Sequence, residues 1–172
     1  DTDIERARTA MAHFSDLLRT ALNRTSMDEI PLRDELAFIE SYLALERLRL
    51  GDRLSVTIDV PRDLYDAVVP TMVLQPLVEN AIRHGVEHRR GTGRVDVTVQ
   101  AEADRLRMRV INDAGSGGSR GAGIGLRNTR GRLHALYGSA QELVAGPLQD
   151  DRFEVSVAMP LRIIPAATEL AS

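Results

Sequence analysis

LVENAIRHG, residues 77–85, is the stretch of this chain that says most about its fold, and two glycine-containing runs follow it, DAGSG at 113–117 and GAGIGL at 121–126. A carboxylate flanked by glycines can meet a flat, amine-bearing ring at a strand end, and a glycine run before a helix lets backbone N–H groups close on phosphates. The amide oxygen of an asparagine is a neutral ligand of the kind that magnesium favours. Together the three stretches predict a nucleotide pocket.

The first stretch belongs to a helix predicted over residues 71–85, whose apolar side chains recur at helical spacing. Its polar face collects Pro76, Asn80, Arg83 and His84, which are three or four residues apart. Asn80 could ligate magnesium, and Arg83 or His84 could meet phosphate oxygens one turn further along. Such a face also suits the solvent side of an ordinary amphipathic helix, so this stretch alone leaves both interpretations open.

The second stretch begins with Asp113, directly after a strand predicted over residues 105–111. Its carboxylate could accept a hydrogen bond from the amino group of adenine. Two glycines that follow would make room for the ring, Gly115 and Gly117. A polar turn after a strand uses the same residue types, so the pattern is weak by itself.

The third stretch precedes a helix predicted from about residue 124 to 137, and its glycines could hold phosphates through their amides and the helix N-terminus. These glycines are Gly121, Gly123 and Gly125. A glycine triplet alone also suits a flexible linker. The prediction of a pocket therefore rests on the order of the three stretches, each on the element that its role requires.

The rest of the chain predicts helices and strands in mixed order. Helices are expected at 3–23 and from Pro31 to near Gly51, and the glycine- and serine-rich segment 115–123 is expected to form a mobile lid. Strands are expected at 53–60, 94–101, 105–111, 140–146 and 152–159, the second and third as a hairpin. The small, polar tail from Pro165 is expected to fray.

Composition excludes several classes of protein. The net charge of -3, with three Phe, three Tyr and no Trp, argues against nucleic-acid binding. All 22 basic residues are arginine, so a Walker P-loop and a protein-kinase strand lysine are both ruled out. The chain has no cysteine for a disulfide or thiolate metal site, and no apolar run of about 18 residues that would span a membrane.

The motifs LQPLVENAIRHG, DAGSG and GAGIGL, followed by Asn128, Arg132, Leu133, Tyr137 and Gly138, resemble the ATP-binding domain of LytS-type sensor histidine kinases. FSDLLRTAL and LRDELAFIESYLALERLRLGDRL match the family's earlier blocks, so the resemblance covers nearly all of residues 10–160. The wider group is the GHKL superfamily, which includes gyrase and MutL. The resemblance implies an α/β Bergerat fold, a two-layer sandwich with a mixed sheet packed on helices, preceded by an N-terminal helical segment.

The same resemblance implies a division into domains and a set of roles. Residues 1–29 would be the second helix of a dimerisation and phosphotransfer hairpin with its linker, 30–164 the catalytic domain and 165–172 a flexible tail. Asn80 would bind magnesium, Asp113 would bind adenine, and Glu79 would tune the attacking group beside Asn80. The remaining nucleotide-binding residues would be Arg83, His84, Gly115, Gly117, Gly121, Gly123, Ile124, Gly125, Leu126 and Asn128.

Three departures from the family pattern qualify this picture. Relatives that hydrolyse ATP carry a glutamate four residues before the magnesium asparagine, where this chain has Pro76, so efficient hydrolysis is not expected. Asp151, Arg152 and Phe153 replace the third glycine box. The family's phosphoacceptor histidine lies in a block like NPHFLFN, which this chain lacks, and the surroundings of His13 fit the second hairpin helix instead.

The sequence therefore predicts the catalytic part of a two-component histidine kinase, an enzyme that presents ATP and Mg²⁺ to a histidine upstream of this chain. A response regulator would receive the phosphoryl group, and the intact parent would be a homodimer. The parent would be a membrane-anchored bacterial sensor, and this domain would lie in the cytoplasm without contacting the membrane. Two alternatives stay open. One is a stand-alone GHKL protein, either an anti-sigma-type serine kinase or an ATPase, and the other is an interaction module that binds no nucleotide.

Overall fold

The structure is a computed structural model, and it describes residues 28–87, 89, 91–114 and 124–164. The predicted helix at 3–23, the lid at 115–123 and the tail from 165 lie outside the described residues. So do three of the histidine-kinase features discussed above, namely His13 and the two pairs of glycines at 115, 117 and 121, 123.

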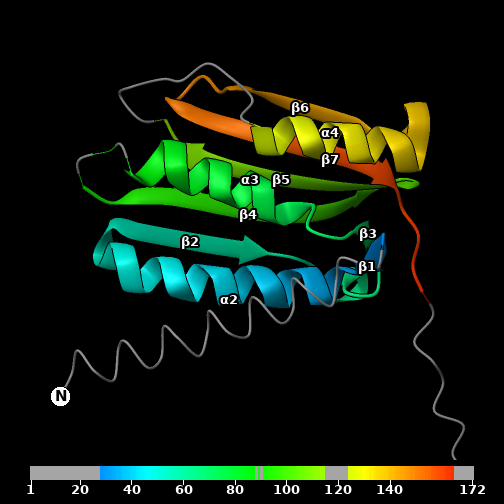
Figure 1. Cartoon of the computed structure of the whole chain (residues 1–172), viewed down its shortest axis with the longest axis horizontal. Helices are drawn as coiled ribbons and strands as arrows, with labels where there is room; N and C mark the ends of the chain where they lie inside the picture. The colour runs from blue at the N-terminus through cyan, green and yellow to red at the C-terminus, as the bar shows by residue number, and fades with distance from the viewer. Residues whose placement is uncertain (1–27, 88, 90, 115–123, 165–172) are drawn as a thin grey trace, which may run out of the picture.

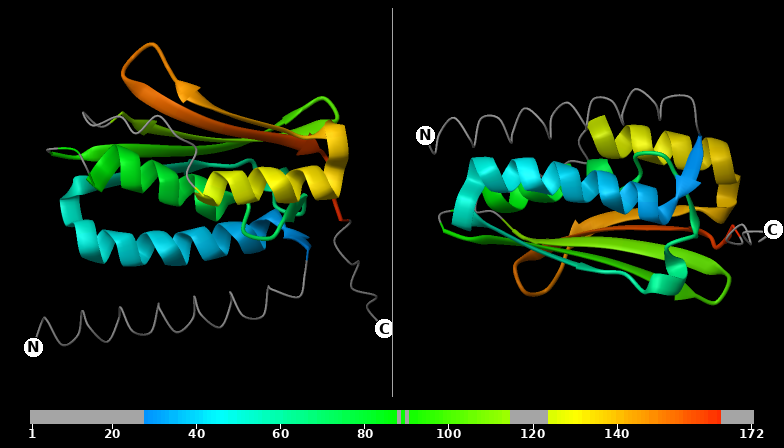
Figure 2. Two further views of the ribbon diagram at one scale, coloured as in Figure 1. Left: turned by 45° about the horizontal axis from the view of Figure 1, so that its top comes forward. Right: turned by 90° about the horizontal axis from the view of Figure 1, so that it is seen from below.

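A mixed sheet of five strands forms one layer of the described domain, and helices form the other. The strand order is β2-β4-β5-β7-β6, with β2 parallel to β4 and every other neighbouring pair antiparallel. Figure 2 shows α2, α3 and α4 on one face of this sheet, and Figure 1 shows them side by side with α3 in the middle. This arrangement confirms the predicted two-layer α/β fold.

The element bounds follow the sequence pattern closely. The helices are α2 (Leu32–Leu50), α3 (Leu74–Ile82) and α4 (Ile124–Tyr137). The sheet consists of β2 (Leu54–Asp59), β4 (Gly93–Glu102), β5 (Arg105–Asp113), β6 (Glu142–Pro147) and β7 (Arg152–Pro160). A separate antiparallel pair is formed by β1 (Glu29–Pro31) and β3 (Val68–Pro70).

The core lies between the two layers. Strand residues that alternate along β4 and β5 point at the helices and are buried, and the predicted apolar stripes of α2 and α3 cover them. The buried strand residues are Val95, Val97, Val99, Leu106, Met108 and Val110, and the helix residues include Leu36, Ile39, Leu43, Leu74, Leu77 and Val78. The hydrophobic spacing therefore predicted the inward faces correctly.

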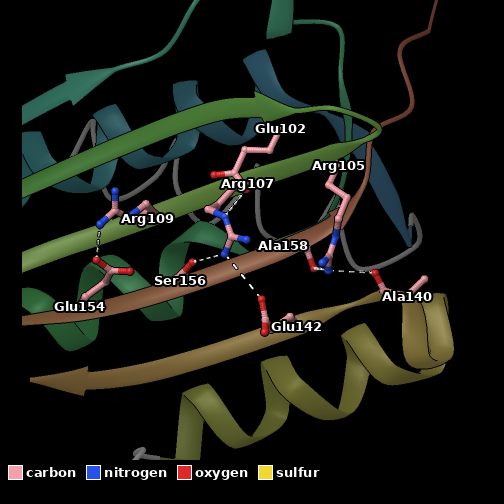
Figure 3. A network of polar contacts seen from close by, with 9 residues as sticks. All are labelled: Glu102, Arg105, Arg107, Arg109, Ala140, Glu142, Glu154, Ser156 and Ala158. Atoms are coloured by element: carbon pink, nitrogen blue, oxygen red, sulfur yellow. Dashed lines mark hydrogen bonds and ion pairs between the residues drawn. The ribbon is translucent and has the colours of Figure 1, made fainter.

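The other face of the sheet is polar and lined with paired charges. Arg107 lies 2.7 Å from Glu102, and Arg109 lies 2.5 Å from Glu154. Further contacts join Arg107 to Glu142 and Ser156, and Arg105 to the carbonyls of Ala140 and Ala158, as Figure 3 shows. Because oppositely charged neighbours across strands satisfy one another, this face needs no helix to cover it.

Helix α3 is shorter than predicted, because the chain before it makes a tight turn. Met72 has a positive φ of 58°, whereas residues in a right-handed helix have negative φ values. The helix therefore cannot begin at residue 71. The carboxylate of Glu35, fully buried on α2, accepts the N–H groups of Met72 and Leu74, both at 3.0 Å. From α4, Arg132 donates to the Met72 carbonyl at 3.0 Å. At its other end α3 passes into a π-helical turn, Arg83–Glu87.

The segment that enters the domain is held at the far end of α4. Glu29 on β1 accepts a hydrogen bond from the Tyr137 hydroxyl at 2.5 Å and forms an ion pair with Arg162. The Arg162 guanidinium also lies over the Tyr137 ring. Burial alone would raise the pKa of Glu29, but the hydrogen bonds from Arg162 and Tyr137 and the Arg162 charge outweigh it and hold that pKa below its ordinary value.

Replacing Glu35 by alanine is expected to lower the free energy of unfolding by about 3 kcal/mol, because the buried N–H of Leu74 and the part-buried N–H of Met72 lose their acceptor. Glu40→Ala on the exposed side of the same helix is the control and should cost less than about 0.5 kcal/mol. Urea unfolding of both variants measures the difference. Equal stabilities would show that the start of α3 does not depend on Glu35.

Glu29→Gln should destabilise the domain in a pH-dependent way. Since the folded-state pKa of Glu29 is lowered, its charge stabilises the fold above the ordinary carboxyl pKa of 4.5, and this contribution disappears as the pH falls below that value. The variant should be about 1 kcal/mol less stable than the wild type at pH 7 and equally stable in acid. Urea titrations at pH 7 and below pH 4 test this, and a gap that persists in acid would contradict it.

Candidate functional site

Asn80 lies on the polar face of α3 with Pro76, as the helical spacing predicted. Both side chains are half-buried, whereas Glu79 and Arg83 are exposed and His84 is half-buried. Among the described residues, no group of three or more His, Cys, Asp or Glu side chains could hold a metal ion. A magnesium ion here would therefore depend on the Asn80 amide oxygen together with phosphate and water oxygens, a set that suits its preference for oxygen ligands and retained water.

The start of α4 lies against the same face of α3. A Cβ added to Gly125 would be 3.4 Å from the Pro76 Cβ, so the first turn of α4 is next to the residue one turn before Asn80. Ile124 is 69% exposed, Gly125 and Asn128 are exposed, and only Leu126 of this turn is buried. The structure thus brings the described part of the third stretch beside the first, at the helix end whose N–H groups have no partner within the helix itself.

The end of α3 is also in close contact with the end of β5. A Cβ on Gly85 would lie 2.5 Å from Asn112 Nδ2 and 2.8 Å from the Asp113 carbonyl oxygen, distances at which no side chain fits. Gly93 on β4 is restricted in the same way by the Gly85 carbonyl, at 2.8 Å. Glycine at position 85 therefore allows the first and second stretches to touch.

Asp113 and its neighbour Asn112 differ in orientation. The Asp113 carboxylate accepts the backbone N–H of Arg94 on β4 at 3.0 Å and is half-buried. Asn112 is 2% exposed and continues the helix-facing series of β5, because side chains alternate along a strand. Its Nδ2 donates to the Asp113 carbonyl at 2.7 Å, and its Oδ1 is buried without a hydrogen-bond partner among the described residues.

At the end of β5, where the family pattern would place a third glycine box nearby, a backbone hydrogen bond joins the chain to the turn before β7. Asp151 has a positive φ of 52° in the turn between β6 and β7, and its carbonyl accepts the N–H of Ala114 at 2.7 Å. This contact continues the pairing of β5 with β7 one residue beyond Asp113. The substituted segment therefore supports the strand end where the glycine segment begins.

Glu79 is exposed on α3. Its carboxylate accepts a hydrogen bond from Gln75 Nε2 at 2.7 Å, one turn earlier on α3. On α2, burial raises the pKa of the Tyr42 hydroxyl, and the charges of Glu46 and Glu79 add to this rise. The charge of Glu79 therefore acts on the Tyr42 hydroxyl of the neighbouring helix α2.

Three residues that hold α3 and the end of β5 in place were not predicted from the sequence. Glu35 and Arg132 fix the start of α3, a role that the sequence did not predict for either residue, although Arg132 belongs to the family motif. Burial lowers the pKa of Arg132, partly offset by the charge of Glu35. Asn112 was passed over because Asp113 completes the glycine motif. The alternation of β5 was the signal that could have found it, since Val110 and Asn112 share one face.

Comparisons with known proteins identify the family. The sequence profile of the family described as "Histidine kinase" matches residues 1–54. The chain is 30% identical over 162 residues to the sensor histidine kinase BtsS of Escherichia coli, covering 93% of this chain and 29% of BtsS. It is 33% identical over 156 residues to the sensor protein LytS of Staphylococcus haemolyticus, covering 82% of this chain and 26% of LytS. The chain thus spans less than a third of either relative.

Solved structures agree in fold at low sequence identity. The catalytic domain of the histidine kinase ThkA superposes with a TM-score of 0.55 at 19% identity, over 77% of this chain and 93% of that domain. Full-length ShkA, solved in complex with AMPPNP, superposes with a TM-score of 0.59 at 17% identity, over 90% of this chain and 37% of ShkA. The chain is thus a homologue of the LytS-type sensor histidine kinases, and its described residues have the fold of histidine kinase catalytic domains.

Proposed function

We propose that this chain binds ATP with Mg²⁺ between α3, the end of β5 and the start of α4, and that it serves as the catalytic domain of a two-component sensor histidine kinase. One observation carries the proposal: Gly125 against Pro76 and Gly85 against Asn112 bring the three predicted stretches together around the polar face of α3. The AMPPNP complex of ShkA, which shares the fold, supports a nucleotide as the ligand.

Each part of the proposed site would contact a different part of the nucleotide. The Asn80 amide oxygen would hold the metal, and the N–H groups at the start of α4 would donate to the phosphates. The polar pair at the end of β5, Asn112 and Asp113, would meet the base. Arg83, His84 and Asn128 lie on the flanking turns, together with Ile124, Gly125 and Leu126. Gly115 and Gly117 would make room for the ring, and Gly121 and Gly123 would complete the phosphate side.

The reaction that fits this site is transfer of a phosphoryl group to nitrogen. An imidazole nitrogen of the phosphoacceptor histidine would attack the γ-phosphorus in line, the bond to the bridging oxygen would break, and ADP would leave. Magnesium, when bound, neutralises negative charge on the phosphates. The protein contributes position and N–H groups, and its α3 offers Pro76 where a base for activating water would stand.

The wider setting of the proposal follows from the relatives. The phosphoacceptor would be a histidine of the parent protein outside the described domain, and a response regulator aspartate would take the phosphoryl group. The parent would be a homodimeric, membrane-anchored bacterial sensor with this domain in the cytoplasm. None of the helices in the described part of the chain is long and apolar enough to cross a membrane.

Asn80→Ala should remove the effect of magnesium on nucleotide binding. In calorimetric titrations with AMPPNP, the wild-type chain should bind at least tenfold more tightly with Mg²⁺ than with EDTA, because Asn80 holds the ion against the phosphates. The variant should bind equally under both conditions. His134→Ala, exposed on α4 away from the site, is the control. A full magnesium effect in Asn80→Ala would exclude Asn80 as the ligand.

Pro76→Glu should increase ATP hydrolysis by roughly tenfold, since it places a general base one helical turn before Asn80. Glutamine has nearly the same shape as glutamate but cannot act as a general base, so Pro76→Gln should hydrolyse ATP as slowly as the wild type. Phosphate release in the presence of Mg²⁺ measures all three proteins. Equal rates in the Glu and Gln variants would mean that this position does not face the γ-phosphate.

A further inference from the structure

We propose that Arg53, at the end of the short turn Gly51–Arg53 between α2 and β2, is a positioning residue for the nucleotide site. Its guanidinium holds the backbone of the π-helical turn Arg83–Glu87, which continues α3 beyond Asn80. The assignment rests on the nucleotide site proposed above and deepens it. Arg53 acts through the turn and not by contact with the ligand.

The first argument is the convergence of three carbonyls on one nitrogen. Nη2 of Arg53 lies 3.2 Å from the carbonyl oxygen of Val86, 3.4 Å from that of Glu87 and 3.1 Å from that of Arg89. The last carbonyls of a helix have no acceptor role within the helix, so a positively charged donor stabilises that end. Arg53 therefore caps the turn from a different part of the chain.

The second argument is the packing of the turn against the sheet. Val86 is fully buried, and a Cβ added to Gly93 on β4 would lie 2.8 Å from the Gly85 carbonyl oxygen. Gly93 is the register partner of Leu54 on β2, the residue that directly follows Arg53. The turn thus rests on the start of the parallel pair β2 and β4, where Arg53 also lies. Packing limits its approach to the sheet, and Arg53 holds its carbonyl end.

A second arginine reaches the same turn from the end of α2. Arg49 forms an ion pair with the Glu87 carboxylate at 2.5 Å, and its side chain is 52% exposed. An exposed ion pair contributes little to stability and leaves the path of the backbone free to vary. The bonds of Arg53 go to the backbone itself, so Arg53 is the residue that sets the path of the turn.

The third argument is what the turn carries. Its first two residues, Arg83 and His84, are the candidates for phosphate contacts that directly follow α3. Beyond the turn, the Arg89 guanidinium donates to the carbonyl of Ala114 at 3.3 Å, just before the glycine-rich segment. If the carbonyls lost Arg53, the bound nucleotide would have to order this backbone itself, and affinity would fall.

Calorimetric titration of the whole chain with AMPPNP and Mg²⁺ tests the assignment. Arg53→Ala should bind at least about tenfold more weakly than the wild type, because charge-assisted hydrogen bonds to the turn are lost. Arg53→Lys should bind within about threefold of the wild type, since its ammonium group can donate to the same carbonyls. Arg47→Ala is the matched control, which removes the same charge from an exposed position on α2.

A purely structural role predicts a different result. Loss of stability alone would leave the affinity of the folded protein unchanged, so the titrations are run well below the unfolding temperature of each variant. The ratio of affinities with Mg²⁺ and with EDTA should keep its wild-type value in Arg53→Ala, because Arg53 holds the turn and not the ion. Asn80→Ala should lose that ratio.

The outcomes separate the two proposals. If the wild type does not bind AMPPNP, the proposed function fails and this assignment with it. If the wild type binds and Arg53→Ala binds within about threefold of it, the nucleotide site stands and Arg53 does not position it. An Arg53→Lys variant as weak as Arg53→Ala, or an equal loss in Arg47→Ala, overturns the assignment too.

A second variant covers the case in which Arg53→Ala does not fold. Arg53→Met keeps most of the apolar stem without the donors, and it then takes the place of the alanine variant under the same criteria. If neither variant folds, Arg53 serves the stability of the whole domain, and its assignment as a positioning residue is overturned.

Discussion

The carboxylate of Glu35 is the contact on which the placement of α3 depends. It is fully buried on α2, accepts two N–H groups from the turn that opens α3, and lies in the field of Arg132 from α4. The turn itself contains a strained backbone at Met72, which persists only because both its N–H and its carbonyl are held from outside. One charged group from each flanking helix therefore sets where α3 starts, and so where Asn80 lies.

The hydrophobic pattern was sufficient to predict the layers but not the ends of the elements. Helical spacing predicted the buried stripe of α2, and alternation predicted the hairpin of β4 and β5, because burial imposes those periods on the sequence. The prediction extended α3 by three residues at each end. At the start, tertiary hydrogen bonds hold Met72 outside the helix, and at the other end the helix widens into a π-helical turn, neither of which has a local signal.

For the site, the order of the three motifs along the chain predicted which segments meet, whereas the residues within each motif said less about individual roles. The contacts of Gly85 with β5 and of Gly125 with Pro76 agree with the expectation that the three stretches meet. The roles assigned to single residues stay predictions, since four of the glycines lie outside the described residues. The glycine motif points to Asp113, and alternation along β5 turns its neighbour Asn112 toward the helices.

Helix α4 connects the proposed nucleotide site with the segment that leads into α2. Its first turn lies against Pro76 beside the proposed nucleotide site, and its last residue, Tyr137, holds Glu29 where the chain enters the domain. Its fourteen residues make a helix about 20 Å long. Leu126 and Leu133 anchor it in the core, and Arg132 ties it to the start of α3. The same helix therefore contacts both the segment that precedes α2 and the residue beside the proposed site.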